Sequence, residues 1–401
     1  MGSESVPIGR RVAYWRSRRR MSQQVFADRL GKSKSWVDKV ERGARSLDKI
    51  STIAEIAAVL RIDREVLLGR DVQPEDTGTR IEDVERIRAV LSTYEMALGR
   101  RAAGRDVPPP AQLARSVGHA WTTYQHARYP QLSKGLPELV LGAQRGYVRE
   151  PETGRTSLVE VYRVTASLLL KLGETGLAWL IADRAMTIAT GDPALVAAAA
   201  VQLGQVLRAT GRARSAVPIM RAAAYRIAPP DLDGGPAARL SLCGTLLVQA
   251  ALAAAHNGDE MVTSSLIDEA AELAARVCDG HDHHRTGFGP TVTTAARMLV
   301  ALELGNPGEA LAWHEKTIGS DGWRWLPVEH RAAHLVDAAR AHLQADDPAN
   351  AGKLLLAAEA TAPAEVRHRP VARDLLAQVI RSRHAPSPLV PLAAALGLSA
   401  V

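Results

Sequence analysis

A turn residue recurs at long, similar intervals through the second half of the chain. Five such positions follow helix-like apolar patterns at spacings of 38, 47, 47 and 41 residues, and a small residue comes five positions after each. The turn residues are Gly173, Gly211, Gly258, Gly305 and Asp346, and the small residues are Ala178, Ala216, Thr263, Ala310 and Ala351. Periods of this length are typical of stacked helix pairs, because one pair cannot bury its apolar face alone. We therefore predict a helical-repeat body.

The composition favours helices over sheets. Aromatic residues make up 4% of the 401 residues and Phe occurs twice, whereas sandwiches and barrels draw on aromatic and β-branched residues. With only Cys243 and Cys278, a disulfide scaffold is excluded and a reducing cytoplasm is indicated. The N-terminus has no apolar signal segment, and apolar runs such as 246–255 are shorter than the ~20 residues that cross a bilayer. We expect an all-α, cytoplasmic protein with no membrane partner.

Positive charge is concentrated at the N-terminus. Residues 1–70 hold 16 Lys and Arg against 8 Asp and Glu, a net charge of +8, while residues 71–401 hold 34 against 35, a net charge of −1. A basic segment on a near-neutral body predicts a module that binds a polyanion, although such charge can also serve solubility alone. The polar stretch 71–80 contains Pro and Gly and is predicted to be a linker. This divides the chain into domains 1–70 and 81–401.

The N-terminal segment is predicted to form five short helices. We place them at 8–20, 23–30, 34–42, 48–60 and 63–68. Ser22 and Ser33 can cap the second and third helices at their N-termini, and Gly31 and Gly43 can end them.

Apolar, turn and polar residues of this segment fall into one register. The positions that form the pattern are Ser22, Gln23, Phe26, Ala27, Leu30, Gly31, Ser33, Ser35, Val37, Val40, Glu41, Arg42 and Gly43. This pattern resembles the phage-repressor-like, or xenobiotic-response-element (XRE), helix-turn-helix family. The resemblance implies a five-helix lambda-repressor-like domain whose third helix lies in the DNA major groove.

The resemblance also assigns roles to individual residues. It implies that the residues facing the bases are Ser33, Lys34, Ser35 and Lys39. It implies that Gln23 touches phosphate and braces the third helix, and that the remaining phosphate contacts are Arg42, Arg45, Arg18 and Arg19. Arg16 and Glu41 occupy positions that form a structural ion pair in relatives. Trp36 is larger than the residue usual at its position, and we expect it to pack against the fourth helix or to contact a thymine methyl or sugar.

The body resembles tetratricopeptide (TPR) repeats over residues 155–362, with an irregular helical bundle as the alternative. Helices are also expected within 81–99 and 110–149, and capping helices near 364–401, including one over 364–383. Together with the N-terminal pattern, the stretches 287–305 and 326–342 resemble actinobacterial XRE–TPR regulators.

These resemblances imply a sequence-specific DNA-binding transcriptional regulator. Its partners are expected to be double-stranded DNA, a second copy of the chain, and a peptide, small-molecule or protein effector held by the TPR-like domain. The candidate groove residues are Gln202, Gln249 and Thr293, which can also be ordinary exposed helix residues. The alternative is a DNA-localised interaction scaffold of the replication- or telomere-associated type. Either protein would be cytoplasmic and nucleoid-associated.

Signals for catalysis are weak. Residues 31–33 read Gly-Lys-Ser, but Phe26 occupies the place of the leading glycine in a phosphate-binding loop. No nucleophile-elbow or Rossmann pattern occurs in the sequence. The loop 278–290 gathers Cys278, Asp279, His281, Asp282, His283 and His284. A zinc site usually needs a second ligand group at defined spacing, so we expect a solvated connection there. The sequence predicts no enzyme, no cofactor and no metal site.

Overall fold

The computed structural model describes residues 8–18, 21–45, 47, 50–60, 77–93, 107–382 and 386–398. Every regular element in these ranges is a helix, which confirms the all-α prediction. The chain divides into two compact units, Met1–Thr79 and Arg80–Val401.

The N-terminal unit contains four helices in its described residues. They are α1 (Ile8–Arg18), α2 (Gln23–Leu30), α3 (Lys34–Glu41) and α4 (Ile50–Leu60). Their shared core buries Val12, Phe26, Ala27, Val37, Val40, Leu47, Ile53, Ile56, Ala57 and Leu60. The expected fifth helix, 63–68, lies outside the described residues.

The helix ends of this unit follow from local sequence, as predicted. Ser22 Oγ accepts a hydrogen bond from Val25 N at 3.2 Å, and Ser33 Oγ accepts one from Trp36 N at 3.1 Å. Gly31 ends α2 with φ of +61°, a left-handed conformation that favours glycine. Gly31 and the Ser33 cap set the turn between α2 and α3, while Ser22 fixes the start of α2.

A close approach of α1 to α3 depends on Gly9. A Cβ atom at this position would lie 2.0 Å from the carbonyl oxygen of Val40 and 3.2 Å from that of Glu41. No side chain fits in that space. Glycine therefore allows the backbone of α1 to contact the end of α3 directly.

The linker expected at 71–80 is in part wrong. Helix α6 (Thr77–Leu91) begins inside it, while residues 71–76 lie outside the described residues. The apolar side chains of Val84, Ile87 and Leu91 enter the core of the second unit. Burial of that stripe outweighs the cost of about 1 kcal/mol for the single glycine, Gly78, within the first turn.

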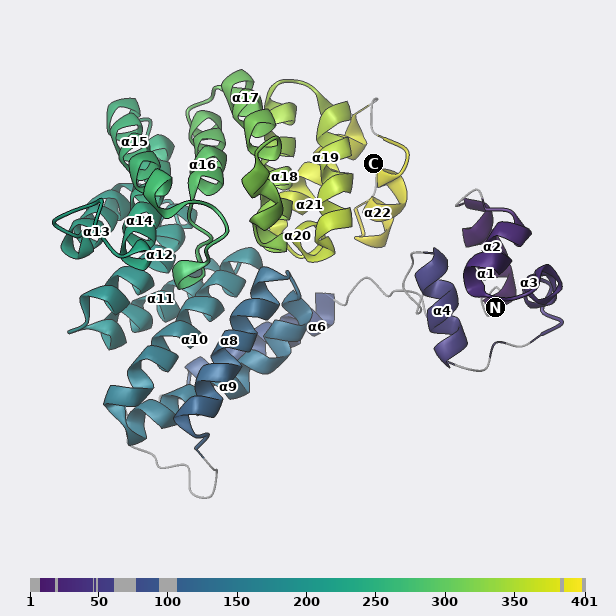
Figure 1. Ribbon diagram of the computed structural model, residues 1–401, viewed down its shortest axis with the longest axis horizontal. Coiled ribbons are helices and arrows are strands. Elements are labelled where there is room, and N and C mark those ends of the chain that lie inside the picture. Colours follow the sequence, from purple (N-terminus) through teal and green to yellow (C-terminus); the bar gives the residue numbers. More distant parts are fainter. Residues whose placement is uncertain are drawn as a thin grey trace. The chain divides into compact units, whose positions relative to one another are not determined.

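The second unit is a stack of antiparallel helix pairs (Figure 1). The pairs are α8 (Pro110–Gln125) with α9 (Tyr129–Arg149), α10 (Pro151–Lys171) with α11 (Thr175–Ala189), α12 (Pro193–Ala209) with α13 (Ala213–Ile227), α14 (Ala237–His256) with α15 (Glu260–Val277), α16 (Pro290–Glu303) with α17 (Pro307–Ile318), and α18 (Val328–Gln344) with α19 (Pro348–Thr361). The first helix of each pair contacts the first helix of the next. In addition, α18 contacts α8, so the first and last pairs meet.

The repeat signal in the sequence is confirmed residue by residue. The five turn residues have φ of +78°, +72°, +74°, +81° and +58°, all left-handed. The five small residues are each at most 1% exposed. The pair formed by α8 and α9 was missing from the repeat pattern because its turn is made by Ala127, with φ of +53°, where no glycine marks it.

The C-terminal helix expected over 364–383 is wrong as a single element. It is split into α20 (Pro363–Arg367) and α21 (Pro370–Arg381), and α22 (Leu389–Ala395) follows. Pro370 causes the break because it has no N–H to donate and its ring clashes with the preceding turn. Arg369 before it is extended, with φ of −82° and ψ of 118°.

In the described part of the chain, α14 alone is long and apolar enough to cross a membrane, and 78% of its apolar window is buried. It lies between α13, α15 and α16, so its apolar character is that of a core helix.

Candidate nucleic-acid interface

The turn between α2 and α3 leads into an exposed face of α3. Ser33, Lys34, Ser35 and Lys39 are all exposed, whereas Val37, Val40 and Glu41 are buried. The predicted base-facing residues therefore lie on the solvent side of this short helix. The Ser33 oxygen already accepts the capping hydrogen bond, which leaves its O–H as a donor.

The buried carboxylate of Glu41 anchors α3 to α1 and to the start of α2. Arg16 Nε donates to Glu41 Oε1 at 2.6 Å, and Arg16 Nη2 donates to Glu41 Oε2 at 3.1 Å. Gln23 Nε2 donates to the same Oε2 at 2.8 Å, and Arg16 Nη1 donates to the carbonyl of Met21 at 2.7 Å. These contacts join α1, the start of α2 and the end of α3. They give Arg16 and Glu41 a structural position and give Gln23 a bracing contact.

The basic residues of this face differ in their contacts. Arg42 forms an ion pair with Asp38 one turn earlier, and the Arg45 guanidinium lies 5.9 Å from the centre of the half-buried Trp36 ring. Neither Lys34 nor Lys39 forms an ion pair with a described residue. Exposed ion pairs contribute at most about 1 kcal/mol, so Arg42 can exchange its partner at little cost. The Arg18 side chain and Arg19 lie outside the described residues.

The half-buried Trp36 packs against the core of the N-terminal unit, alongside Leu30 and Val59. The expected contact of Trp36 with the fourth helix, or with a thymine methyl or sugar, stays a prediction.

The family comparison agrees with this geometry. A family model described as a helix-turn-helix domain matches residues 7–68. The N-terminal unit carries a helix-turn-helix domain. No curated protein matches the chain in sequence.

Three solved structures are similar to the chain at low identity. A crystal structure of Bacillus thuringiensis PlcR with the peptide PapR7 and DNA has 13% identity and a TM-score of 0.38, and the match covers 79% of this chain and 93% of that one. BtubC (BKLC) from P. vanneervenii has 17% identity and a TM-score of 0.38, with 62% and 90% covered. A PrgX mutant has 10% identity and a TM-score of 0.35, with 84% and 95% covered. We draw no functional conclusion from similarities at this level.

Two of the three candidate groove residues, Gln202 and Thr293, are buried contacts between helices. Gln202 is 4% exposed, and its Oε1 accepts a hydrogen bond from the buried Arg163 at 2.9 Å. Thr293 is 2% exposed, and its hydroxyl donates to the carbonyl of Gly289 at 3.0 Å. Gln249 is half-buried, and its Oε1 has no hydrogen-bond partner among the described residues. The prediction failed for Gln202 and Thr293 because helix register alone does not tell a groove position from an inter-helix contact.

A buried charge cluster joins the two ends of the repeat unit, and sequence analysis missed it. Lys171 at the end of α10 forms ion pairs with Glu329 of α18 and with Glu365 of α20. Tyr129 at the start of α9 donates to Glu365, while Arg369 approaches Glu365 at 3.3 Å. We call the cluster of Tyr129, Lys171, Glu329, Glu365 and Arg369 the seam. No local pattern marks it, because its members come from helices far apart in the sequence.

Charge pairing outweighs burial within the seam. Burial alone would lower the pKa of Lys171, but the carboxylates of Glu329 and Glu365 raise it above its usual value. Burial would likewise raise the pKa of Glu329, but the charge of Lys171 lowers it to about 2. Both partners are therefore held in their charged forms at neutral pH.

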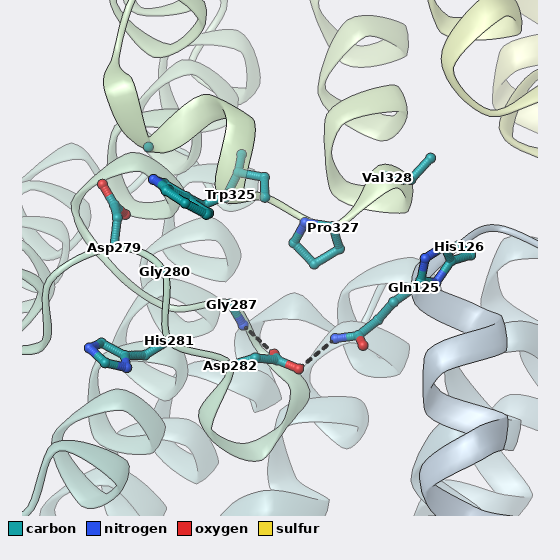
Figure 2. Close-up of a pocket in the computed structure, with 12 residues that line it drawn as sticks. Gln125, His126, Asp279, Gly280, His281, Asp282, Gly287, Trp325, Pro327 and Val328 are labelled. Carbon is teal, nitrogen blue, oxygen red and sulfur yellow. Dashed lines mark hydrogen bonds between the residues drawn. The ribbon is translucent and has the colours of Figure 1, made fainter.

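The loop 278–290 is more than the solvated connection expected from sequence. Asp282 accepts hydrogen bonds from Gln125 Nε2 at 2.9 Å and from Gly287 N at 3.2 Å (Figure 2). The carbonyl of His284, in the short 3-10 helix η1 (His283–Arg285), accepts one from Arg163 Nη2 at 2.9 Å. In the described ranges, no three His, Cys, Asp or Glu side chains are grouped to hold a metal ion. The loop ties α8 and α10 to the later repeats.

Proposed function

We propose that this protein is a sequence-specific DNA-binding transcriptional regulator. The observation that carries the proposal is the helix-turn-helix unit, in which α3 exposes Lys34, Ser35 and Lys39 while Arg16, Gln23 and Glu41 hold it in place. Bidentate donation from lysine to guanine O6 and N7 suits the major groove. Ser33 is a further base-facing candidate.

The remaining basic residues are proposed to position the protein on the duplex. Arg42 and Arg45 are exposed beside α3, where phosphate oxygens can replace their present partners. Together with Arg18 and Arg19, they would add affinity without reading sequence. The domain is proposed to be of the XRE type, within residues 1–70, and the full chain to be an actinobacterial type of regulator in the cytoplasm, associated with the nucleoid.

The repeat unit is proposed to dimerise and to bind an effector. One short recognition helix reads few base pairs, whereas two copies would read half-sites roughly 10 bp apart. A helical-repeat stack offers an extended surface for a peptide, a small molecule or a protein.

Selection of duplexes from a random pool by the full-length protein tests the proposal. We expect enrichment of one sequence with two related half-sites, and a dimer by size measurement in solution. Enrichment of no sequence at low salt would refute a sequence-specific regulator. Enrichment of DNA ends in place of internal sites would favour the alternative of a DNA-localised scaffold.

A further inference from the structure

A small pocket lies beside the seam, where three distant parts of the repeat unit meet. Its volume is about 250 Å³. One wall is the end of α8, with Gln125 and His126; a second is the loop that contains Asp279 and Asp282; the third runs from the short 3-10 helix η2 (Asp321–Trp325) to the start of α18 (Figure 2). An occupant would therefore contact both the first and the last helix pair.

Two residues of the pocket wall are chain neighbours of residues at or near the seam. Gln125 follows Tyr124, a buried residue whose pKa is raised by burial and by the nearby charges of Glu329 and Glu365. Val328 in the pocket wall directly precedes Glu329. The end of α8 and the start of α18 thus carry both pocket residues and residues at or near the seam.

The chemistry of the wall selects for positive charge. Among its twelve residues are the carboxylates of Asp279 and Asp282 and the imidazoles of His126 and His281, with no lysine or arginine. Asp279 accepts hydrogen bonds from Thr291 N at 3.1 Å and from Thr291 Oγ1 at 2.8 Å, so its position is fixed. A carboxylate oxygen accepts more than one hydrogen bond, which leaves capacity for a ligand.

An exposed indole adds a second recognition element. Trp325 is 62% exposed and forms part of the pocket wall. The guanidinium of Arg324, its neighbour in the chain, lies 5.2 Å from the centre of its ring, a distance at which an indole attracts a cation. Arg285 similarly approaches Asp282 at 3.4 Å. Neither Arg324 nor Arg285 is among the residues of the pocket wall.

We propose that this seam pocket binds a small organic cation, an ammonium or guanidinium group on a short apolar stem. Asp282 and Asp279 would accept its hydrogen bonds, and Trp325 would contact its charge or stem. The volume suits a small molecule or one side chain of a peptide, since sites for larger ligands occupy about 300–1,000 Å³. This inference rests on the proposed function, because it assigns a site and a chemical class to the effector of that regulator.

Calorimetric titration of the full-length protein with agmatine, which carries a guanidinium and an amine, tests the proposal. We expect saturable binding that is absent with butylurea, a neutral probe of similar shape, and with the glutarate anion. Asp282→Asn should weaken agmatine binding about tenfold or more, and Trp325→Leu about 3- to 30-fold. Asp183→Asn, at an exposed position of α11, is the matched control and should leave the affinity unchanged.

Two variants keep the test decisive. Asp282→Asn also changes hydrogen bonds within the loop, so the melting temperature of this variant is compared with that of the wild type. If the loop is disturbed, Trp325→Leu is the variant that tests the pocket. No saturable heat at tens of millimolar agmatine would overturn the inference. So would equal binding of butylurea, or wild-type affinity in both pocket variants. Duplex selection in the absence of agmatine is scored separately: sequence selection without agmatine binding refutes only the pocket, and binding of agmatine without sequence selection refutes the regulator.

Discussion

Lys171 Nζ lies 2.8 Å from Glu365 Oε1, which joins the end of α10 to α20 across the ends of the repeat unit. The Glu365 side chain is fully buried and that of Lys171 is 14% exposed. A buried ion pair adds little net stability over an apolar contact, but removing one partner leaves an unpaired charge. We therefore expect the seam to influence which helices meet more than it raises the net stability.

Lys171→Met should destabilise the repeat unit strongly. The substitution leaves Glu329 and Glu365 buried without their shared cation, at a cost of about 3–5 kcal/mol. Urea unfolding followed by circular dichroism measures the change. Lys134→Met, at an exposed position of α9, should change the free energy of unfolding by under about 0.5 kcal/mol.

A double variant separates charge from packing in the seam. Lys171→Met with Glu365→Gln should recover part of the lost free energy, since only one of the two carboxylates that shared Lys171 then remains charged. Additive losses in the double variant would contradict the electrostatic explanation.

Gly9→Ala should loosen the N-terminal unit. Its new Cβ would lie 2.0 Å from the Val40 carbonyl oxygen, so α1 and α3 must separate, at a cost of about 1–3 kcal/mol. Hydrogen exchange in α1 and α3 should become faster, and DNA affinity should fall. Gly118→Ala is the control, because nothing lies within 4 Å of a Cβ at this helical glycine. It should stabilise α8 by roughly 0.5–1 kcal/mol, and a similar loss in both variants would contradict the close-contact explanation.

Lys34→Ala and Lys39→Ala should each weaken binding to the selected duplex. A lost bidentate base contact costs about 1–3 kcal/mol of discrimination. Binding is compared on the selected duplex and on random DNA at one fixed salt concentration. Lys134→Ala is the matched exposed control in the other unit. An equal loss of affinity on both duplexes would show that these lysines contact phosphates. Other residues would then have to contact the bases.

The stability of the repeat unit should fall as the pH drops below about 6.5. His314 Nδ1 and His334 Nε2 lie 2.9 Å apart in a buried hydrogen bond. Burial and the neighbouring His314 lower the pKa of His334 to about 4. Between that value and the usual pKa near 6.5, the unfolded state binds more protons, so stability is lost on acidification, by up to about 3 kcal/mol.

Urea unfolding at several pH values from 7.5 to 4.5 checks this dependence. The pH profile of the free energy of unfolding is compared between the wild type and variants. His334→Gln removes the titrating group and should flatten the profile relative to the wild type. His281→Gln, at an exposed position, should retain the wild-type slope. A His334→Gln profile parallel to the wild type would show that other groups cause the loss.

Local features of the fold could be predicted because each depends on a few neighbouring residues. The caps at Ser22 and Ser33 each satisfy a backbone N–H group three residues away. The left-handed turns at Gly173 and Asp346 end one helix and start another within their own segments. The exposure of Lys34 and Lys39 follows from the apolar period of α3.

Two predictions failed, one because of tertiary packing and one because of a proline. Gln202 occupies a helix position that could face a groove, yet Arg163 and the packing of α10 on α12 bury it. The break at Pro370 divides a stretch that otherwise has a continuous helical pattern.

The sequence alone determined an all-helical chain, the turns of its repeat body and the exposed face of α3, since these depend on residues close together along the chain. Only the tertiary structure decided that α8 meets α18, that Lys171 pairs with Glu329 and Glu365, and that a pocket forms beside them. The reason is geometric, because a small rotation at each helix pair accumulates along the stack. The total rotation cannot be predicted from any short segment of the sequence.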